Sequence, residues 1–112
     1  MKADIRDNGV AILSPKGSLV GGDLLDDLKT TAQGLLAQGT RRLVLDLSGV
    51  DLVNSTGLGS LIGLSSSFQE NDGKVVLSGA DKKIQNLFVI TRLASVFPLV
   101  DTVDEGIAMA SA

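Results

Sequence analysis

The stretch that decides the fold runs from Leu43 to Gly63 and reads LVLDLSGVDLVNSTGLGSLIG. Its first part, residues 43–47, is an almost unbroken apolar run, which is typical of a strand buried on both faces. A turn-rich segment of seven residues follows, and apolar residues then recur at the spacing of a helix. The stretch therefore predicts a central strand, a turn and a helix, with Asn54, Ser55, Thr56 and Gly57 at the junction of turn and helix.

Two adjacent hydroxyl groups, those of Ser55 and Thr56, lie at the predicted N-terminus of this helix. Free backbone N–H groups and the helix dipole favour negative charge at such a position, so a phosphate would be accommodated there. Ser and Thr are also routine N-cap residues, and residue types alone favour the interpretation that one of the two only caps the helix.

The N-terminal part of the chain predicts a hairpin followed by a helix. Apolar residues on either side of Asn8-Gly9 indicate two strands joined by a tight two-residue turn. Asp23 is the predicted N-cap of a helix that carries one apolar stripe and stops at Gly39.

The C-terminal part continues the alternation of strands and helices. A strand over 74–78 leads through Asp81 into a helix, and residues 96–100, interrupted by Pro98, fit a short edge strand. Thr102 and Glu105 form a capping-box pattern for a last helix. The order β-β-α-β-α-β-α-β-α predicts an α/β fold with a mixed sheet, in one domain over 1–112.

The predicted helix after Ser55 is rich in small residues, and two interpretations of them are equally favoured. Small side chains let another backbone approach closely, either a docking partner or the protein's own sheet. The residues concerned are Gly59, Ser60, Gly63, Ser66 and Ser67.

Composition and motifs argue against an enzyme. The chain has no Cys and no His, which removes disulfides, thiolate chemistry, the usual zinc sites and every imidazole base. Gly57-Leu58-Gly59 lacks the third glycine of a dinucleotide fingerprint, because Ile62 stands there, and the chain contains no phosphate-binding P-loop or serine-hydrolase elbow. The carboxylates Asp46, Asp51 and Asp81 more often act as caps or turn residues than as a catalytic set. No cofactor and no metal are expected.

Charge and hydropathy restrict the partners. The net charge is -3 and the ten basic residues are scattered, so direct nucleic-acid binding is not expected. No apolar run approaches the roughly 20 residues that span a bilayer, and no signal-peptide core is present, so we expect a cytoplasmic protein without membrane insertion.

Two segments, 46–50 and 54–59, resemble the STAS domain of bacterial anti-sigma factor antagonists, whose signature is D-L-S-x-V followed by D-[ST]-[ST]-G-L-G. The likeness extends to Gly17-Ser18-Leu19 and to residues 73–77 and 81–88, and so covers nearly the whole chain. The resemblance implies a STAS-type mixed sheet of about four to five strands, with about four helices packed mainly on one face.

The resemblance also implies a function and a site. In the family, the first hydroxyl residue of the pair is phosphorylated by an anti-sigma factor that is a serine kinase, and a PP2C-type phosphatase reverses this. The acceptor here is then Ser55, with Thr56 as its neighbour. The resemblance implies that the unphosphorylated protein binds the anti-sigma factor and so frees a sigma factor, and a phosphate would block the docking face without unfolding the domain. The implied partner-binding residues are Asn54, Ser55, Thr56, Gly57, Leu58 and Gly59.

The chain departs from the family pattern at two positions. Asn54 stands where the family commonly has Asp before the acceptor, and Val20 stands where Asp is frequent. An alternative function within the same resemblance is a STAS subunit of a membrane ABC transport complex, of the kind that moves phospholipids, where the motif helix docks on an ATPase and is not phosphorylated.

Overall fold

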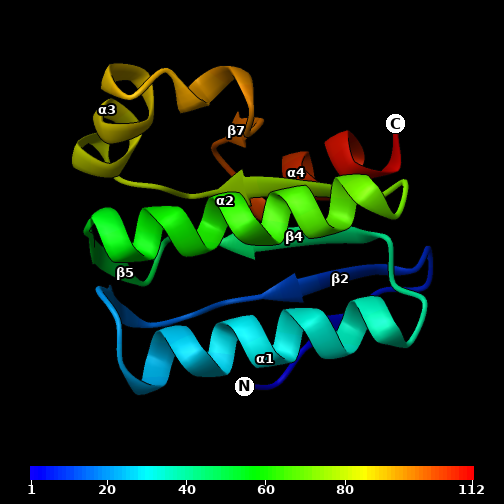
Figure 1. The fold of residues 1–112 in the computed structure, drawn as a ribbon. Coiled ribbons are helices and arrows are strands. Elements are labelled where there is room, and N and C mark those ends of the chain that lie inside the picture. Colours follow the sequence, from blue (N-terminus) through cyan, green and yellow to red (C-terminus); the bar gives the residue numbers. More distant parts are fainter.

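The computed structural model describes all 112 residues and contains a five-stranded mixed sheet (Figure 1). The strand order is β1-β2-β4-β6-β7, with β1 antiparallel to β2 and every other pair parallel. The bounds are β1 Asp4–Ile5, β2 Val10–Leu13, β4 Arg42–Asp46, β6 Lys74–Ser78 and β7 Leu99–Val100. The mixed α/β fold is confirmed, including the central strand β4 and the short edge strand β7.

The N-terminal hairpin is confirmed, but the prediction of a two-residue turn is wrong. The Arg6 N–H donates to the Val10 carbonyl at 2.9 Å, and the Arg6 carbonyl accepts from the Gly9 N–H at 2.9 Å, which leaves a three-residue loop. A two-residue turn of the usual hairpin type needs positive φ at both central residues, whereas here only Gly9 adopts it, at +84°. Asn8 instead uses its side-chain oxygen to accept from the Val10 N–H at 3.2 Å.

A second, two-stranded sheet was not predicted. It pairs β3 (Gly17–Leu19) in parallel with β5 (Val50–Val53), inside the segment that the sequence indicates as turn-rich. The two strands are short, and polar side chains interrupt their apolar pattern. Two of these, Ser18 and Asp51, form a hydrogen bond of 2.7 Å across the pair. β3 leads towards the start of one helix and β5 leads directly into another.

The helices lie mainly on one face of the sheet, as expected. Figure 1 shows the neighbouring helices α1 and α2 in front of the sheet, running in the same direction, with α4 behind it. The larger core, to which α1, α2 and α3 contribute, holds 21 buried residues, whereas the core under α4 holds five. Leu43 and Leu45 of β4 face the larger core and Val44 the smaller one, so this strand is buried on both faces. The helices are α1 Asp23–Ala37, α2 Ser55–Glu70, α3 Lys82–Ile90 and α4 Val103–Ser111, with a 3-10 turn at Leu93–Ser95.

The ends of the helices confirm some predicted caps and correct one. Thr102 caps α4 by accepting from the Glu105 N–H at 3.1 Å, and Gly39, with φ of +101°, follows the end of α1. Asp23 is not the N-cap of α1, because Gly22 occupies that position with φ of +94° and no side-chain cap bond is made. Asp23 is instead the first helical residue, where the helix dipole favours its carboxylate.

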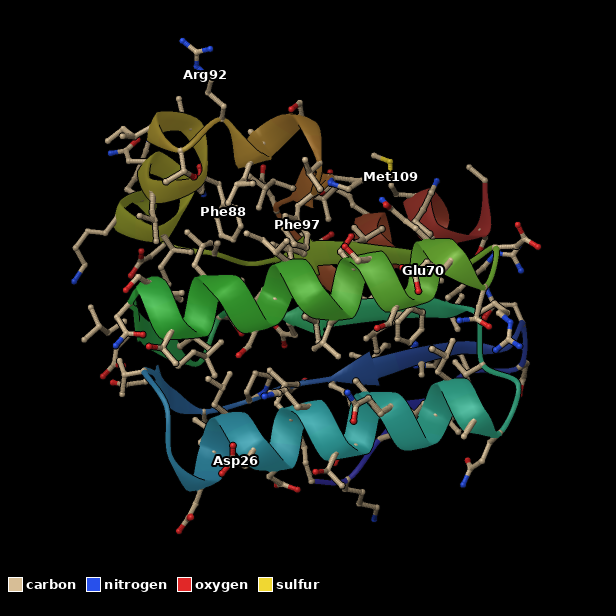
Figure 2. The ribbon with its side chains drawn as sticks, viewed as in Figure 1. Asp26, Glu70, Phe88, Arg92, Phe97 and Met109 are labelled. Atoms are coloured by element: carbon tan, nitrogen blue, oxygen red, sulfur yellow. The ribbon has the colours of Figure 1, made fainter.

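A pair of phenylalanines fixes α3 to the segment that follows it. The rings of Phe88 and Phe97 meet edge to face, with centroids 5.5 Å apart and planes at 73° (Figure 2). Both side chains are completely buried, whereas Arg92 in the connecting turn extends outward, as Figure 2 shows. None of the helices combines the length and the apolar run that crossing a membrane would require.

Candidate functional site

Asn54 caps α2. Its side-chain oxygen accepts from the Gly57 N–H at 2.9 Å, and its backbone carbonyl accepts from the Leu58 N–H at 2.8 Å. The alternative in which Ser55 or Thr56 caps the helix is therefore wrong. Both residues are exposed, and neither hydroxyl takes part in a hydrogen bond within the chain. The two hydroxyl groups are left free at the first turn of the helix.

Asn54 also attaches the start of α2 to the loop between β3 and α1. Its side-chain amide donates to the Val20 carbonyl at 3.2 Å, and its backbone N–H donates to the Leu19 carbonyl at 3.3 Å. An aspartate at this position would keep the cap but would have no N–H to donate to the Val20 carbonyl. Asparagine at position 54, where the family pattern has aspartate, thus adds a hydrogen bond between the start of α2 and the β3–α1 loop.

The glycines of α2 separate into two kinds. A Cβ on Gly57 would lie 1.9 Å from the Leu19 carbonyl oxygen, so the close approach of α2 to β3 requires glycine there. A Cβ on Gly59 or Gly63 would meet nothing within 4 Å. Tight packing on the protein's own structure is therefore the role of Gly57, while Gly59 and Gly63 open onto the surface.

A groove of about 390 Å³ runs between α1 and α2. Leu64 is the only hydrophobic residue in its lining, and Lys29 is the only charged one. The Lys29 ammonium makes no ion pair and no hydrogen bond within the chain. The lining comprises Lys29 and Gln33 from α1, and Ser55, Thr56, Gly59, Ser60, Gly63, Leu64 and Ser67 from α2. Most small ligands bind in enclosed, apolar pockets, and this groove is open and lined by polar residues. It is therefore better suited to contact with the surface of another protein.

The other side of the α2 N-terminus carries apolar surface that sequence reasoning missed. Leu52 on β5 is 52% exposed, and Val20 in the loop that Asn54 holds is 37% exposed. Leu52 lines a hollow of about 160 Å³ together with Lys83 and Leu87 of α3. Neither Lys29 nor Leu52 had a sequence signal, since Lys29 lies in an ordinary amphipathic helix and Leu52 in a segment read as turn.

The three carboxylates considered from the sequence do not gather into a site. Asp46 accepts from the Ser48 N–H at 3.1 Å, Asp51 from the Ser18 hydroxyl, and Asp81 from the Ile84 N–H at 2.9 Å as the cap of α3. No group of three or more acidic side chains is placed to hold a metal ion. The chemistry that the α2 N-terminus offers is that of free hydroxyl groups beside an open groove.

Comparison with known proteins agrees with the resemblance that the sequence motifs indicate. The STAS domain family model matches residues 4–106. The anti-sigma-B factor antagonist of Staphylococcus aureus is 32% identical over 78 residues, which cover 66% of this chain and 72% of that protein.

Solved structures share the fold. An anti-sigma factor antagonist from Mycobacterium paratuberculosis superimposes with a TM-score of 0.83 at 22% identity, covering 99% of this chain and 92% of that one. The Bacillus cell fate determinant SpoIIAA in its phosphorylated form superimposes with a TM-score of 0.77 at 14% identity, covering 96% of each chain.

Proposed function

The chain belongs to the STAS domain family, and on that premise we propose that it is an anti-sigma factor antagonist switched by phosphorylation of Ser55. In its unmodified form it binds an anti-sigma factor that is also a serine kinase, and so frees a sigma factor for transcription. The observation that carries the proposal is the exposed Ser55 side chain, which is free of the capping role because Asn54 performs it. This function requires a cytoplasmic location, since transcription takes place there.

The switch is a phosphoryl transfer from ATP to Ser55. The bond from the Ser55 Oγ to phosphorus forms, the bond from the γ-phosphorus to the ADP oxygen breaks, and the hydroxyl proton passes to a base of the kinase. A PP2C-type phosphatase then hydrolyses the phosphoester and restores the hydroxyl. The phosphate adds about -1.5 to -2 charges at a helix N-terminus, which favours negative charge, so the fold is retained.

The docking surface comprises the start of α2, residues 54–59, and the groove beside it. Ser55, Thr56 and Gly59 belong to both, so a partner that covers the helix start also covers one end of the groove. A phosphate on Ser55 inside such an interface would lose its hydration and collide with the partner, and these costs dissociate the complex without a large conformational change.

The test is intact-mass spectrometry with fragment mapping, after incubation with ATP, Mg²⁺ and candidate anti-sigma kinases from the same genome. We expect one phosphate on Ser55, absent from Ser55→Ala and retained in Thr56→Ala. Ser66→Ala is the matched control, because Ser66 is an exposed serine of the same helix outside the groove. Binding of the unmodified protein to the same kinase, measured by size-exclusion chromatography, should be lost once the phosphate is present.

Two results would contradict the proposal. Transfer to Thr56 or to any other residue in place of Ser55 would remove Ser55 from the switch. Absence of transfer from every candidate, together with co-purification of an ATP-binding cassette subunit, would support the transport-complex function instead.

A further inference from the structure

Lys29 is an unpaired cation that lines the same groove as the proposed phosphate acceptor. It lies on α1, its side chain is half-buried, and it lines the same groove as Ser55 and Thr56 of α2. No other charged residue lines that groove, and the ion pairs of the chain do not include Lys29. Axes of packed helices lie about 8–10 Å apart, which the flexible four-carbon stem of a lysine can bridge.

We infer that Lys29 is the counter-ion of a phosphate on Ser55, its ammonium group pairing with the phosphoryl oxygens and holding them over the α1–α2 groove. The inference rests on the proposed function, because it concerns the phosphorylated form of that same site. An ammonium group is a compact charge with three donors, which suits the oxygens of a phosphate. The pairing would place the phosphate over Gly59 and close one end of the groove to a partner.

The charges around the site give Lys29 a specific task. The first half of α1 carries the exposed carboxylates Asp23, Asp26 and Asp27, and β5 contributes Asp51. Asp27 pairs with the N-terminal ammonium and Asp51 accepts from the Ser18 hydroxyl, and none of the four lines the groove. Lys29 is therefore the one charged group of the groove, and its positive charge favours a phosphate there. Lys83 lines the apolar hollow beside β5 rather than the groove.

The test uses the full chain with phosphoserine incorporated at position 55 during translation, so that no kinase is needed. The second ionisation of the phosphate is followed by ³¹P NMR as a function of pH. A nearby cation stabilises the dianion, so Lys29→Gln should raise the midpoint of this titration by about half a pH unit. Lys29→Arg keeps the charge and should restore the midpoint of the unsubstituted phosphoprotein.

Two matched controls remove a positive charge elsewhere. Lys83→Gln does so on the other side of the α2 N-terminus, and Arg42→Gln does so at the start of β4, where the side chain is exposed. Circular dichroism confirms that each variant is folded. The inference holds if the midpoint rises more in Lys29→Gln than in either control, and it is overturned if Lys29→Gln stays within the range of the controls.

The result is independent of the kinase experiment. An unchanged titration midpoint in Lys29→Gln would refute the counter-ion role of Lys29, while Ser55 would remain the proposed acceptor. If no kinase modifies Ser55, the proposed phosphorylation switch is refuted, whatever the titration of the phosphoserine protein shows.

Discussion

Single residues at the start of α2 carry separate structural and functional roles. Gly57 is buried against the Leu19 carbonyl, whereas Gly63, six residues further along, faces open space. Asn54 caps the helix and thereby leaves Ser55 free, and it also holds the helix to the β3–α1 loop. A motif that looks uniform in sequence thus contains residues that support the fold next to a residue that is available for modification.

The glycine contrast predicts opposite effects on stability. Gly57→Ala places a Cβ against backbone that has no room for it, and we expect a loss of about 2–3 kcal/mol in the free energy of unfolding. Gly63→Ala removes a flexible residue from an open helical position and should add about 0.5–1 kcal/mol. Urea denaturation followed by circular dichroism measures both, and equal effects of the two substitutions would refute the assigned close contact.

At the scale of elements, two parallel helices and a small sheet build the site. β3 and β5 pair in parallel, and their C-terminal ends lie close to the starts of α1 and α2 at one edge of the molecule. A Cβ on Gly21, in the loop before α1, would lie 3.7 Å from the Thr56 methyl group, which shows how near these two helix starts lie. The groove and the proposed acceptor therefore share one rigid frame.

The groove can be tested as a docking surface with two glycines. Gly59→Leu places a large side chain in the groove, and we expect it to weaken binding of the anti-sigma partner about tenfold or more, through a collision that costs about 1.4–3 kcal/mol. Gly34→Leu is the control, because Gly34 is also an exposed helical glycine with open space around it but lies outside the groove lining. Isothermal titration calorimetry compares the two, and equal affinities would place the partner elsewhere.

At the scale of the whole molecule, composition removes the side chains that ordinarily titrate near neutrality. The chain has no His and no Cys. In ordinary environments carboxylates titrate below, and lysines above, the interval from about pH 5.5 to 7. Stability depends on pH only where the folded and unfolded states bind different numbers of protons.

We therefore expect a constant thermal unfolding midpoint between about pH 5.5 and 7 for the unmodified protein. Phosphorylation adds a group whose second ionisation lies near pH 6. Pairing with Lys29 would depress the pKa of this group in the folded state, so the added stability is present above the unfolded-state value and is lost as the pH falls through the folded-state value. Melting curves of both forms by circular dichroism measure this, and a slope in the unmodified protein would contradict the first expectation.

The sequence by itself determined the features that depend on neighbours along the chain. The apolar run of residues 43–47, the caps at Asp81 and Thr102 and the stop at Gly39 are local patterns, and the alternation of strands and helices follows from them. The strand-turn-helix motif around Ser55 was recognised for the same reason. Local rules gave a wrong prediction at Asn8-Gly9, where the hairpin loop has three residues instead of two. They also failed at Asp23, because Gly22 is the N-cap of α1.

Only the tertiary structure decided which residues at the motif are free and which are held. The β3–β5 sheet pairs segments more than thirty residues apart, with Leu19 opposite Val53. The Asn54 side-chain amide reaches the Val20 carbonyl across the β3–α1 loop, and the groove depends on α1 lying beside α2. These contacts join residues distant in the chain, so no local pattern encodes them, and the close contact at Gly57 and the place of Lys29 in the groove became visible only when the helices were placed.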